Sequence, residues 1–498
     1  MIPLTKVRLA LLMTATILVA FACAYSTNPV TGKKEFFAYS WQQEIKIGTD
    51  ADQGIAQEYG IYDDDEIRQY VDRIGQKVLQ NSHLRREDAG RQFQDTEFTF
   101  RVLDSPIVNA FALPGGYIYV TRGLLAHVEN EAQLGVVLGH EIGHVAARHS
   151  SQRAFKAQLG QIGLIGGAML GQAVFDISAD KILQLGSSAM QYLFLSYSRD
   201  DEREADRLGV EYASKSGYSA GEASHFFRSL KRIQQKTGAT IPSWQSTHPD
   251  PGDREEAVVQ LADTWRTQGY DMSLVNRDPF YNVLDRVVVG ENPRQGFIAN
   301  NVFYHPEMQF QFPVPANWHV LNQPAQVQIV EPNQQAAALI LLFANASSAE
   351  GAAQTFLGQQ GVTVVSRGAV DIGPFSAYSV VADITQDSGI LRVRRTYINL
   401  GNGAIIDFIG LATKNEFATY DAVFQRSHFG FDRLTDQSII NVQPARLDVV
   451  AAPRRATFQS FLPNTLPMHI EPLDLAIMNQ VDLETVIPSG YRIKLITQ

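Results

Sequence analysis

The residues with the clearest capacity for chemistry are His140, Glu141 and His144, which form a His-Glu-x-x-His motif inside an apolar run. Residues four positions apart lie on one face of an α-helix, so His140 and His144 can bind the same cation. Glu141 lies one position round the helix, where it can hydrogen-bond a metal-bound water instead of the metal. Two imidazoles and a nearby base suit Zn²⁺, which lowers the pKa of its bound water toward ~7. The motif therefore predicts hydrolysis of a peptide bond, although three fixed residues also recur by chance in unrelated helices.

A catalytic zinc ion needs a third protein ligand and one open position. The charged stretch 198–209 reads as a second helix, in which Glu202 and Asp206 are four residues apart and share a face. One of these carboxylates can bind the metal while the other orients a ligand imidazole through a hydrogen bond. Glu204 points to a different face, and we expect it to be solvated.

Four sequence blocks, in this order and spacing, resemble the M48 family of zinc metallopeptidases, in particular its periplasmic branch. The blocks are Asn109-Ala110-Phe111-Ala112-x-Pro114-Gly115-Gly116, His140-Glu141-x-x-His144, Glu202-x-x-Ala205-Asp206 and Thr247-His248-Pro249. The resemblance covers residues 28–265. It implies one zinc ion per chain bound by His140, His144 and Glu202, with Glu141 as the general base. Asp206 is then the carboxylate that orients a ligand histidine.

A strand pair is expected before the motif, at residues 102–108 and 116–120, with a Pro-Gly-Gly turn signal between. In zinc peptidases of this type, an edge strand beside the cleft pairs with the substrate backbone. We expect Asn109, Ala110, Phe111 and Ala112 to form that edge and bind substrate. An ordinary hairpin packed on the core explains the same residues equally well.

His248 lies in a short loop in which two prolines fix the backbone. The family resemblance implies that it lies near the metal, where it either stabilises the oxyanion as a catalytic residue or blocks the open coordination position. A lone loop histidine is otherwise more often a surface residue. Arg254 is a weaker candidate for the same cleft. His149 follows His144 by five residues, off the metal face of a continuing helix, so we expect a structural role for it.

The N-terminus has the features of a secretory signal peptide over residues 1–22, because Lys6 and Arg8 precede a short apolar run. Cys23 follows directly and is the only cysteine in 498 residues. Its context resembles the lipidated cysteine of bacterial lipoproteins, and Ala24 favours sorting to the outer membrane. We therefore expect a periplasmic protein with a lipid anchor at Cys23. Conventional cleavage nearby would instead release a soluble periplasmic protein.

Composition supports a globular protein and limits the partners. Apolar residues make up 45% and charged residues 19%, and the net charge of −10 without a basic block argues against nucleic acid. Residues 157–175 contain no charge and are long enough to span a membrane. They fall between metal ligands that must meet in one site, so we expect a hydrophobic helical hairpin beside the cleft.

Beyond residue 265 the composition changes. Residues 266–300 read as a loop-rich linker, and short strands at 327–330, 338–343 and 403–410 predict an α+β sheet domain over 301–435. This domain is weakly similar to PsbP proteins. Residues 440–498 resemble a degenerate LysM module. LysM modules bind N-acetylglucosamine polymers, so peptidoglycan is a candidate partner, but the usual Gly-Asp-Thr turn is absent and a structural role is equally compatible.

The predicted fold class is therefore α+β. It comprises a mainly helical zincin domain of the gluzincin type with a small edge sheet, then a small sheet domain and a short βααβ module. Two functions are compatible with it. The first is a zinc endopeptidase of the bacterial cell envelope that cleaves misfolded, unfolded or misassembled envelope proteins. The second is an envelope scaffold or chaperone-like factor that binds clients or peptidoglycan. The complete set of His140, Glu141, His144, Glu202 and Asp206 favours the peptidase.

Overall fold

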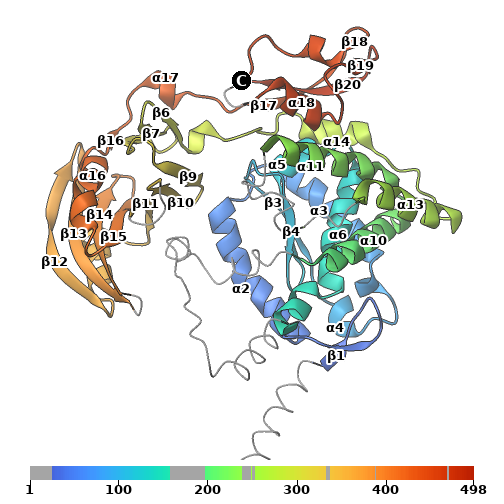
Figure 1. The fold of residues 1–498 in the computed structure, drawn as a ribbon, viewed down its shortest axis with the longest axis horizontal. Helices are drawn as coiled ribbons and strands as arrows, with labels where there is room; N and C mark the ends of the chain where they lie inside the picture. Colours follow the sequence, from blue (N-terminus) through green and yellow to red (C-terminus); the bar gives the residue numbers. More distant parts are fainter. Residues whose placement is uncertain are drawn as a thin grey trace, which may run out of the picture.

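The computed structural model describes residues 25–156, 197–237, 248, 253–332, 337–386, 389–467 and 470–498. They form a mainly helical domain, a sheet domain and a small C-terminal module (Figure 1), which confirms the α+β expectation. The expected signal peptide, Cys23 and the uncharged stretch 157–175 lie outside the described residues. Among the described helices, none combines the length and the apolar character that a membrane span requires.

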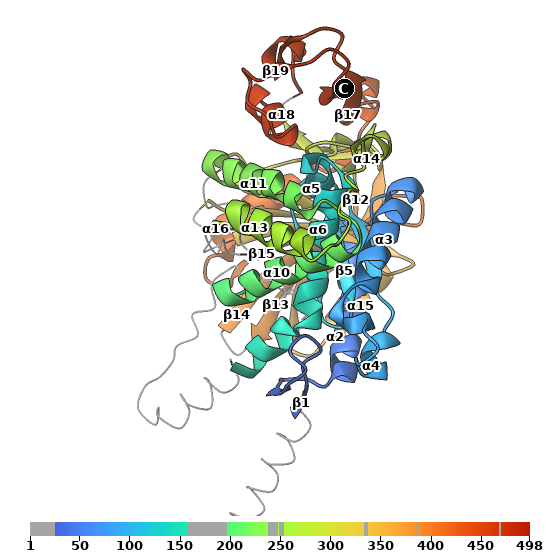
Figure 2. The ribbon, with the colours of Figure 1, turned by 90° about the vertical axis from the view of Figure 1, so that its right-hand side faces the viewer.

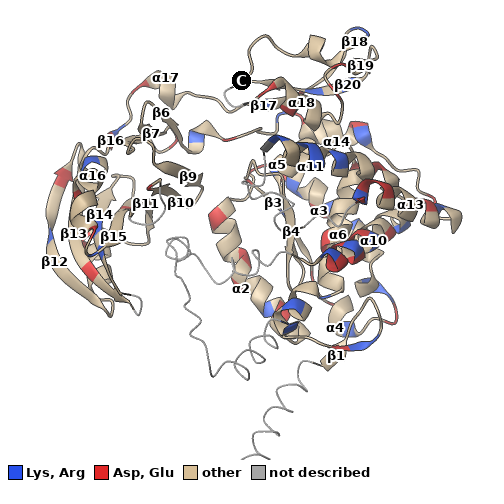
Figure 3. Ribbon diagram, viewed as in Figure 1, with Lys and Arg blue, Asp and Glu red and all other residues tan. Residues whose placement is uncertain are grey.

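Two helices carry most of the candidate metal ligands, α6 (Glu131–Ala146) and α10 (Arg199–Lys215). Side chains cap both N-termini: Asn130 accepts from the Gln133 amide, and Ser198 forms a capping box with Asp201. α6 is buried along its whole length, as its nearly continuous apolar sequence predicts. Along α10, acidic and basic residues are interspersed (Figure 3); its first turns are partly exposed, whereas Leu208 to Ser214 are all buried.

Helices α6 and α10 cross where Gly139 faces Gly209. A Cβ atom on Gly139 would lie 2.9 Å from the Gly209 carbonyl oxygen, and one on Gly209 would lie 2.7 Å from the His140 amide nitrogen. Because these neighbours are backbone atoms, a larger residue at either position would force the helices apart. The two glycines therefore permit the close approach that brings Glu202 beside the motif histidines.

A three-stranded sheet lies next to α6, with the order β3-β5-β4. Strand β3 (Thr99–Leu103) is parallel to β5 (Tyr117–Thr121), and β4 (Ala110–Leu113) is antiparallel to β5 and lies at the edge. The strand expected at 102–108 is thus wrongly placed, because β3 ends at Leu103. The next residue, Asp104, accepts a hydrogen bond of 2.6 Å from Arg122, and the chain turns there so that β4 can return along β5.

The remaining helices of this domain surround α6 and the sheet (Figure 2). They are α2 (Trp41–Tyr59), α3 (Asp65–Gln80), α4 (Arg91–Gln94), α5 (Arg122–His127), α11 (Ala223–Thr237), α13 (Arg254–Thr267) and α14 (Arg277–Leu284). A short antiparallel pair, β1 (Tyr25–Thr27) and β2 (Lys34–Phe36), begins the described chain. Residues 266–300, expected as a loop-rich linker, therefore include the end of α13 and all of α14.

The sheet domain is an antiparallel seven-stranded sheet with the order β12-β13-β14-β15-β11-β10-β9. The strands are β9 (His319–Gln323), β10 (Gln326–Val330), β11 (Ala337–Ala344), β12 (Val362–Ile372), β13 (Phe375–Gln386), β14 (Gly389–Asn399) and β15 (Ile405–Thr413). Successive residues of a strand face opposite sides, so Val380 packs toward α15 (Ala349–Leu357) and Val381 toward the core that contains α16 (Phe417–Phe429). The predicted strands at 327–330, 338–343 and 403–410 correspond to β10, β11 and β15.

A smaller four-stranded sheet lies beside this one, in the order β16-β8-β7-β6. Its strands are β6 (Phe297–Ala299), β7 (Val302–His305), β8 (Phe310–Pro313) and β16 (Asp432–Arg433). Phe310 and Phe312 of β8 are fully buried and belong to the same core as α16.

The C-terminal module has the outer strand pair of the predicted βααβ order, but only one of its two expected helices is an α-helix. Strand β17 (Arg446–Ala451) pairs with β20 (Arg492–Thr497), and between them lie a single 3₁₀ turn (Phe458–Phe461) and α18 (Pro472–Met478). Two short strands, β18 (Ala456–Thr457) and β19 (Val486–Ile487), also pair. Apolar residues of the module join the core of the helical domain. Figures 1 and 2 both place the module against α5, α11 and α14.

Candidate metal centre

Four buried side chains converge between α6 and α10: His140, His144, Glu202 and His248. Each offers one ligand atom, and these atoms all lie within 4.8 Å of one another. The Nε2 atoms of His140 and His144 are 2.9 Å apart, and His144 Nε2 is 3.4 Å from Glu202 Oε1. The structure thus brings together the three expected ligands and the loop histidine. The surface alternative for His248 is wrong, because its side chain is completely buried.

Unpaired buried oxygens indicate that this cluster is built for a cation. Both carboxylate oxygens of Glu141 and Oε2 of Glu202 have no hydrogen-bond partner among the described residues. Burying an unpaired carboxylate is costly, whereas a cation would compensate these charges. Imidazole nitrogen and carboxylate oxygen are the donor types that Zn²⁺ takes in catalytic sites. The residues present therefore fit a zinc ion.

Glu141 lies beside the ligand atoms and is fully buried. Its Oε1 atom is 3.5 Å from Nε2 of His248. Burial raises the pKa of Glu141, and the neighbouring imidazoles of His248 and His140 only partly oppose this effect. In contrast, the pKa of Glu202 is lowered, because the surrounding imidazoles outweigh the cost of burial. The two carboxylates of the site therefore differ in proton affinity.

Asp206 lies one turn along α10 from Glu202 and orients His140. The Nδ1 atom of His140 is 2.9 Å from Asp206 Oδ1, which leaves Nε2 directed at the cluster. Arg254, the first residue of α13, donates from Nε to Asp206 Oδ2 at 2.9 Å. Burial opposes ionisation of Asp206, but Arg254 and His140 hold its pKa below the usual range. Arg254 Nη2 also lies 3.8 Å from Glu202 Oε2, so Arg254 borders the cluster, as expected for a cleft residue.

His248 contacts both the ligand cluster and the edge strand. Its Nδ1 is 3.0 Å from Glu202 Oε1 and 3.2 Å from His140 Nε2, and its Nε2 is 3.3 Å from the carbonyl oxygen of Ala110. The neighbouring residues 247 and 249 lie outside the described part of the chain. His248 thus supplies a fourth donor to the cluster and lies against β4.

The edge strand β4 presents only part of the expected substrate-binding segment. The Thr121 amide donates to the Asn109 carbonyl, so alternate residues of β4 pair with β5, while Ala110 and Ala112 direct their amide and carbonyl groups to the free edge. The backbone groups of Phe111 face β5 and not the free edge. Its ring stacks on Tyr119 with a centroid distance of 4.8 Å. The expectation that Phe111 faces a substrate is therefore wrong.

Three residues near His144 were not recognised from the sequence in this role. Its ring stacks on Tyr197 with a centroid distance of 3.8 Å. Its Nδ1 lies 2.9 Å from Nδ1 of His149, whose Nε2 lies 3.3 Å from Glu204 Oε2. Glu204, expected to be solvated, is partly buried, and its hydrogen bond with His149 lowers its pKa. The helix does not continue to His149 as assumed, since α6 ends at Ala146 and Arg148 has a left-handed φ of 57°.

The comparison with known families agrees with this geometry. Residues 68–262, which include His140, His144 and Glu202, match the family described as "Peptidase family M48". The chain carries an M48 peptidase domain. The matched residues lie inside the range expected for the peptidase domain, 28–265. Because the match is shorter than that range, the domain boundaries stay a prediction.

The chain covers only part of the length of the curated relatives that it matches. The mitochondrial metalloendopeptidase OMA1 of Bos taurus is 34% identical over 173 residues, which are 34% of this chain and 33% of that protein. The beta-barrel assembly-enhancing protease of Escherichia coli K12 is 26% identical over 239 residues, 47% of each protein. The chain thus spans a third to a half of the length of these relatives. A solved structure of cyanobacterial PsbP from Synechocystis aligns with 26% of this chain at 12% identity and a TM-score of 0.23, too weak to argue from.

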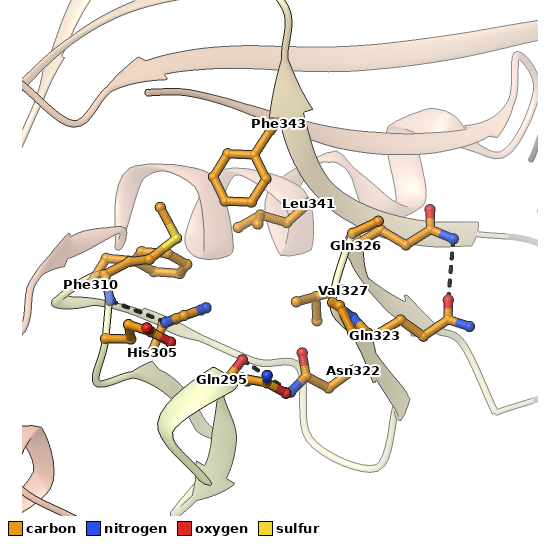
Figure 4. Close-up of a pocket in the computed structure, with 13 residues that line it drawn as sticks. Gln295, His305, Phe310, Asn322, Gln323, Gln326, Val327, Leu341 and Phe343 are labelled. Atoms are coloured by element: carbon orange, nitrogen blue, oxygen red, sulfur yellow. Dashed lines mark hydrogen bonds between the residues drawn. The ribbon is translucent and has the colours of Figure 1, made fainter. Parts of the chain in front are cut away.

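A cavity of about 380 Å³ lies outside the M48 domain, between the β9–β10 hairpin and the β7–β8 hairpin (Figure 4). Amide side chains such as Asn322 and Gln326 line one part, and Phe310, Leu341 and Phe343 line another. The ring of His305 accepts a hydrogen bond from the Met308 amide through Nδ1. The lining residues contain no nucleophile paired with a base, so the cavity suits binding rather than catalysis.

Proposed function

We propose that the protein is a zinc-dependent endopeptidase of the bacterial cell envelope. The observation that carries this proposal is the buried convergence of His140, His144 and Glu202 inside an M48 peptidase domain, beside the Glu141 carboxylate, which has no hydrogen-bond partner among the described residues. A binding protein has no need for this costly arrangement of buried charges.

His140, His144 and Glu202 would hold the zinc ion, which would polarise the scissile carbonyl group and acidify the attacking water. Glu141, which lies beside the ligand atoms, would take a proton from that water and pass it to the leaving amine. Asp206 fixes the His140 ring so that Nε2 faces the site. Arg254 keeps Asp206 in place through its own hydrogen bond.

The free edge of β4 supports an unfolded polypeptide as substrate. An extended segment can add to the edge through the backbone groups of Ala110 and Ala112, and this pairing depends little on the substrate sequence. Folded proteins do not present such a free segment. Together with the relatives named as beta-barrel assembly-enhancing proteases, this edge favours misfolded or misassembled envelope proteins as substrates.

His248 restrains the site in the arrangement described. It lies against the Ala110 carbonyl, which the substrate would use, and it adds a fourth donor where a catalytic site needs an open position. His248 must therefore move before a peptide can bind. We expect His248→Ala to cleave casein faster than wild type, and a loss of activity would instead assign it to oxyanion stabilisation.

The direct test is Glu141→Gln in the purified mature protein. We expect the variant to retain one zinc ion and to lose casein cleavage by several orders of magnitude, because the proton acceptor is gone. The control is Glu87→Gln, which changes an exposed carboxylate outside the site and should cleave at the wild-type rate. A Glu141→Gln enzyme as fast as wild type would refute the assignment.

Localisation to the periplasm, with an outer-membrane anchor at Cys23, belongs to the same proposal. Wild type should incorporate radioactive palmitate and fractionate with membranes, whereas Cys23→Ala should do neither. Unlabelled, soluble wild-type protein would instead indicate ordinary signal-peptide cleavage. Binding of the C-terminal module to peptidoglycan is tested by cosedimentation with purified sacculi.

A second candidate function is client binding without cleavage. The cavity of the sheet domain favours it, because its lining combines amide and apolar side chains with Glu307 and His305, which suits a polypeptide segment. Cells that carry Glu141→Gln distinguish the two functions. A scaffold would still support growth under envelope stress, whereas a protease would not.

A further inference from the structure

We propose that His149 and Glu204 form a positioning pair that orients the imidazole of His144 toward the metal. This inference rests on the proposed metal site and adds two residues to it. Neither residue offers a ligand atom to the metal: His149 contacts the His144 ring, and Glu204 acts through His149.

The ring nitrogens of His144 leave one consistent set of proton positions. Its Nε2 faces His140 and Glu202, so this nitrogen must be unprotonated to bind a metal. The proton of the neutral ring is then on Nδ1, which lies 2.9 Å from Nδ1 of His149. His149 accepts this hydrogen bond, so its own proton is on Nε2.

The imidazole of His149 is in turn hydrogen-bonded to the carboxylate of Glu204. The Nε2–H group of His149 donates to Oε2 of Glu204 at 3.3 Å. His149 is 1% exposed, so its ring has no solvent to satisfy it. The side chain of Glu204 is 34% exposed, so it connects the buried rings of His144 and His149 to the surface of α10. The same orientation is achieved for His140 by Asp206 directly.

The backbone at Arg148 places His149 in this position. Arg148 has a φ of 57°, a conformation that costs free energy for a residue with a side chain. Helix α6 ends at Ala146, and residues 149–156 are helical again after the turn. The turn returns His149 to the His144 ring, which a continuous helix would not do.

Buried contacts of Arg148 hold that turn. Its guanidinium group donates to Glu44 at 2.9 Å and to the Tyr39 carbonyl at 2.7 Å, and it lies 3.7 Å above the Phe37 ring. Helix α2, which contains Glu44, thus fixes the conformation on which the positioning pair depends. The strained residue is explained by this function in ligand orientation.

The test measures zinc affinity by chelator competition and the visible absorption of the Co²⁺-substituted protein. Partners that orient ligand histidines contribute ~10–100-fold to metal affinity. We expect His149→Leu to weaken zinc binding by about this factor and to alter the Co²⁺ spectrum. In His149→Asn, the side-chain oxygen can accept from His144, so this variant should recover most of the affinity. A purely structural role would not distinguish Asn from Leu in this way.

The matched control is His83→Leu, which removes another buried histidine with one hydrogen bond, to the hydroxyl of Tyr212 at 2.8 Å. It should lose stability without a change in zinc affinity. If His149→Leu does not fold, Glu204→Ala provides the measurement, because this residue lies at the surface of α10. We expect a several-fold weaker affinity for Glu204→Ala and none of that loss for Asp200→Ala, an exposed residue of the same helix.

The outcomes separate this inference from the proposed function. Wild-type protein without zinc affinity would refute the metal site itself. Wild-type affinity in both His149→Leu and Glu204→Ala would refute only the positioning pair. Equal losses in His149→Leu and His83→Leu would also overturn it, because the effect would then be a general loss of stability.

Discussion

The buried Lys494 attaches the C-terminal module to the M48 domain, and its replacement by methionine gives a sharp test of that attachment. Lys494 is on β20 and is fully buried. Its Nζ donates to the carbonyl oxygens of Ala126 and Val128 at 2.8 and 3.0 Å, and lies 2.9 Å from Glu129 Oε1. These three residues directly precede α6.

The expected loss follows from the groups that Lys494→Met leaves behind. Two buried carbonyls lose a donor, and an unsatisfied buried polar group costs ~1–3 kcal/mol. Glu129 retains Arg277 at 3.1 Å and the hydroxyl of Tyr281 at 2.6 Å, so its charge stays partly compensated. We therefore expect a loss of about 3 kcal/mol, at the lower end of the cost of breaking a buried ion pair. Methionine keeps most of the apolar volume of the lysine side chain. The loss of unfolding free energy therefore measures the contribution of the lysine ammonium group.

Urea denaturation at pH 7, followed for the transition that includes the M48 domain, measures this loss. The control is Lys414→Met, which removes an exposed lysine that pairs with Asp383 and should cost less than ~1 kcal/mol, because Arg392 still pairs with this carboxylate. The double variant Lys494→Met with Glu129→Gln should lose less than the sum of the two single losses, because the two charges interact. A loss below ~0.5 kcal/mol in Lys494→Met would refute the view that the module is an integral part of the domain.

Three further predictions concern the metal helices and a buried histidine. Gly209→Ala should weaken zinc binding and destabilise the protein by ~1–3 kcal/mol, because its Cβ would collide with α6. The control is Gly221→Ala, whose Cβ would meet only the Cβ of Ala262, at 3.8 Å. Glu202→Ala should abolish tight zinc binding in the chelator assay, whereas Glu204→Ala should retain most zinc at saturating metal. Burial lowers the pKa of His83 to about 4, so the unfolded chain binds more protons below pH 6.5. The free energy of unfolding should therefore fall by ~1–2 kcal/mol from pH 7 to 5 through this residue, and His83→Gln should show a smaller fall in urea titrations.

Short-range patterns predicted much of the site from the sequence. His140 and His144 are related by helical spacing alone, and Asp206 follows Glu202 by the same rule, so one helix geometry predicts which groups share a face. The edge position of Ala110 and Ala112 was also accessible, since they precede a clear turn signal, although the strand before them was misplaced. In each case, the information lies within a few residues of the group that it positions.

The misplaced residues all depend on contacts between distant parts of the chain. Phe111 alternates with the edge residues, but only the packing of Tyr119 and of helix α2 decides that its ring belongs to the core. For Arg254, the sequence did not show the hydrogen-bond partner Asp206, which comes from another helix 48 residues away. From its sequence, the C-terminal module resembled an independent unit. Its packing against α5 and α14 depends on residues far away in the chain, which the sequence of the module does not contain.

His149 is the clearest case, because its position follows from a backbone conformation that the sequence does not announce. Left-handed residues are usually glycine or asparagine, and an arginine at position 148 instead predicts a continuing helix. The turn is stable only because Glu44, Tyr39 and Phe37, more than a hundred residues earlier, surround the guanidinium group. Removing that support should therefore act on the metal through the backbone: Glu44→Gln should weaken zinc binding less than His149→Leu, but in the same direction. A Glu44→Gln variant that loses stability with unchanged zinc affinity would show that the turn persists without its buried ion pair.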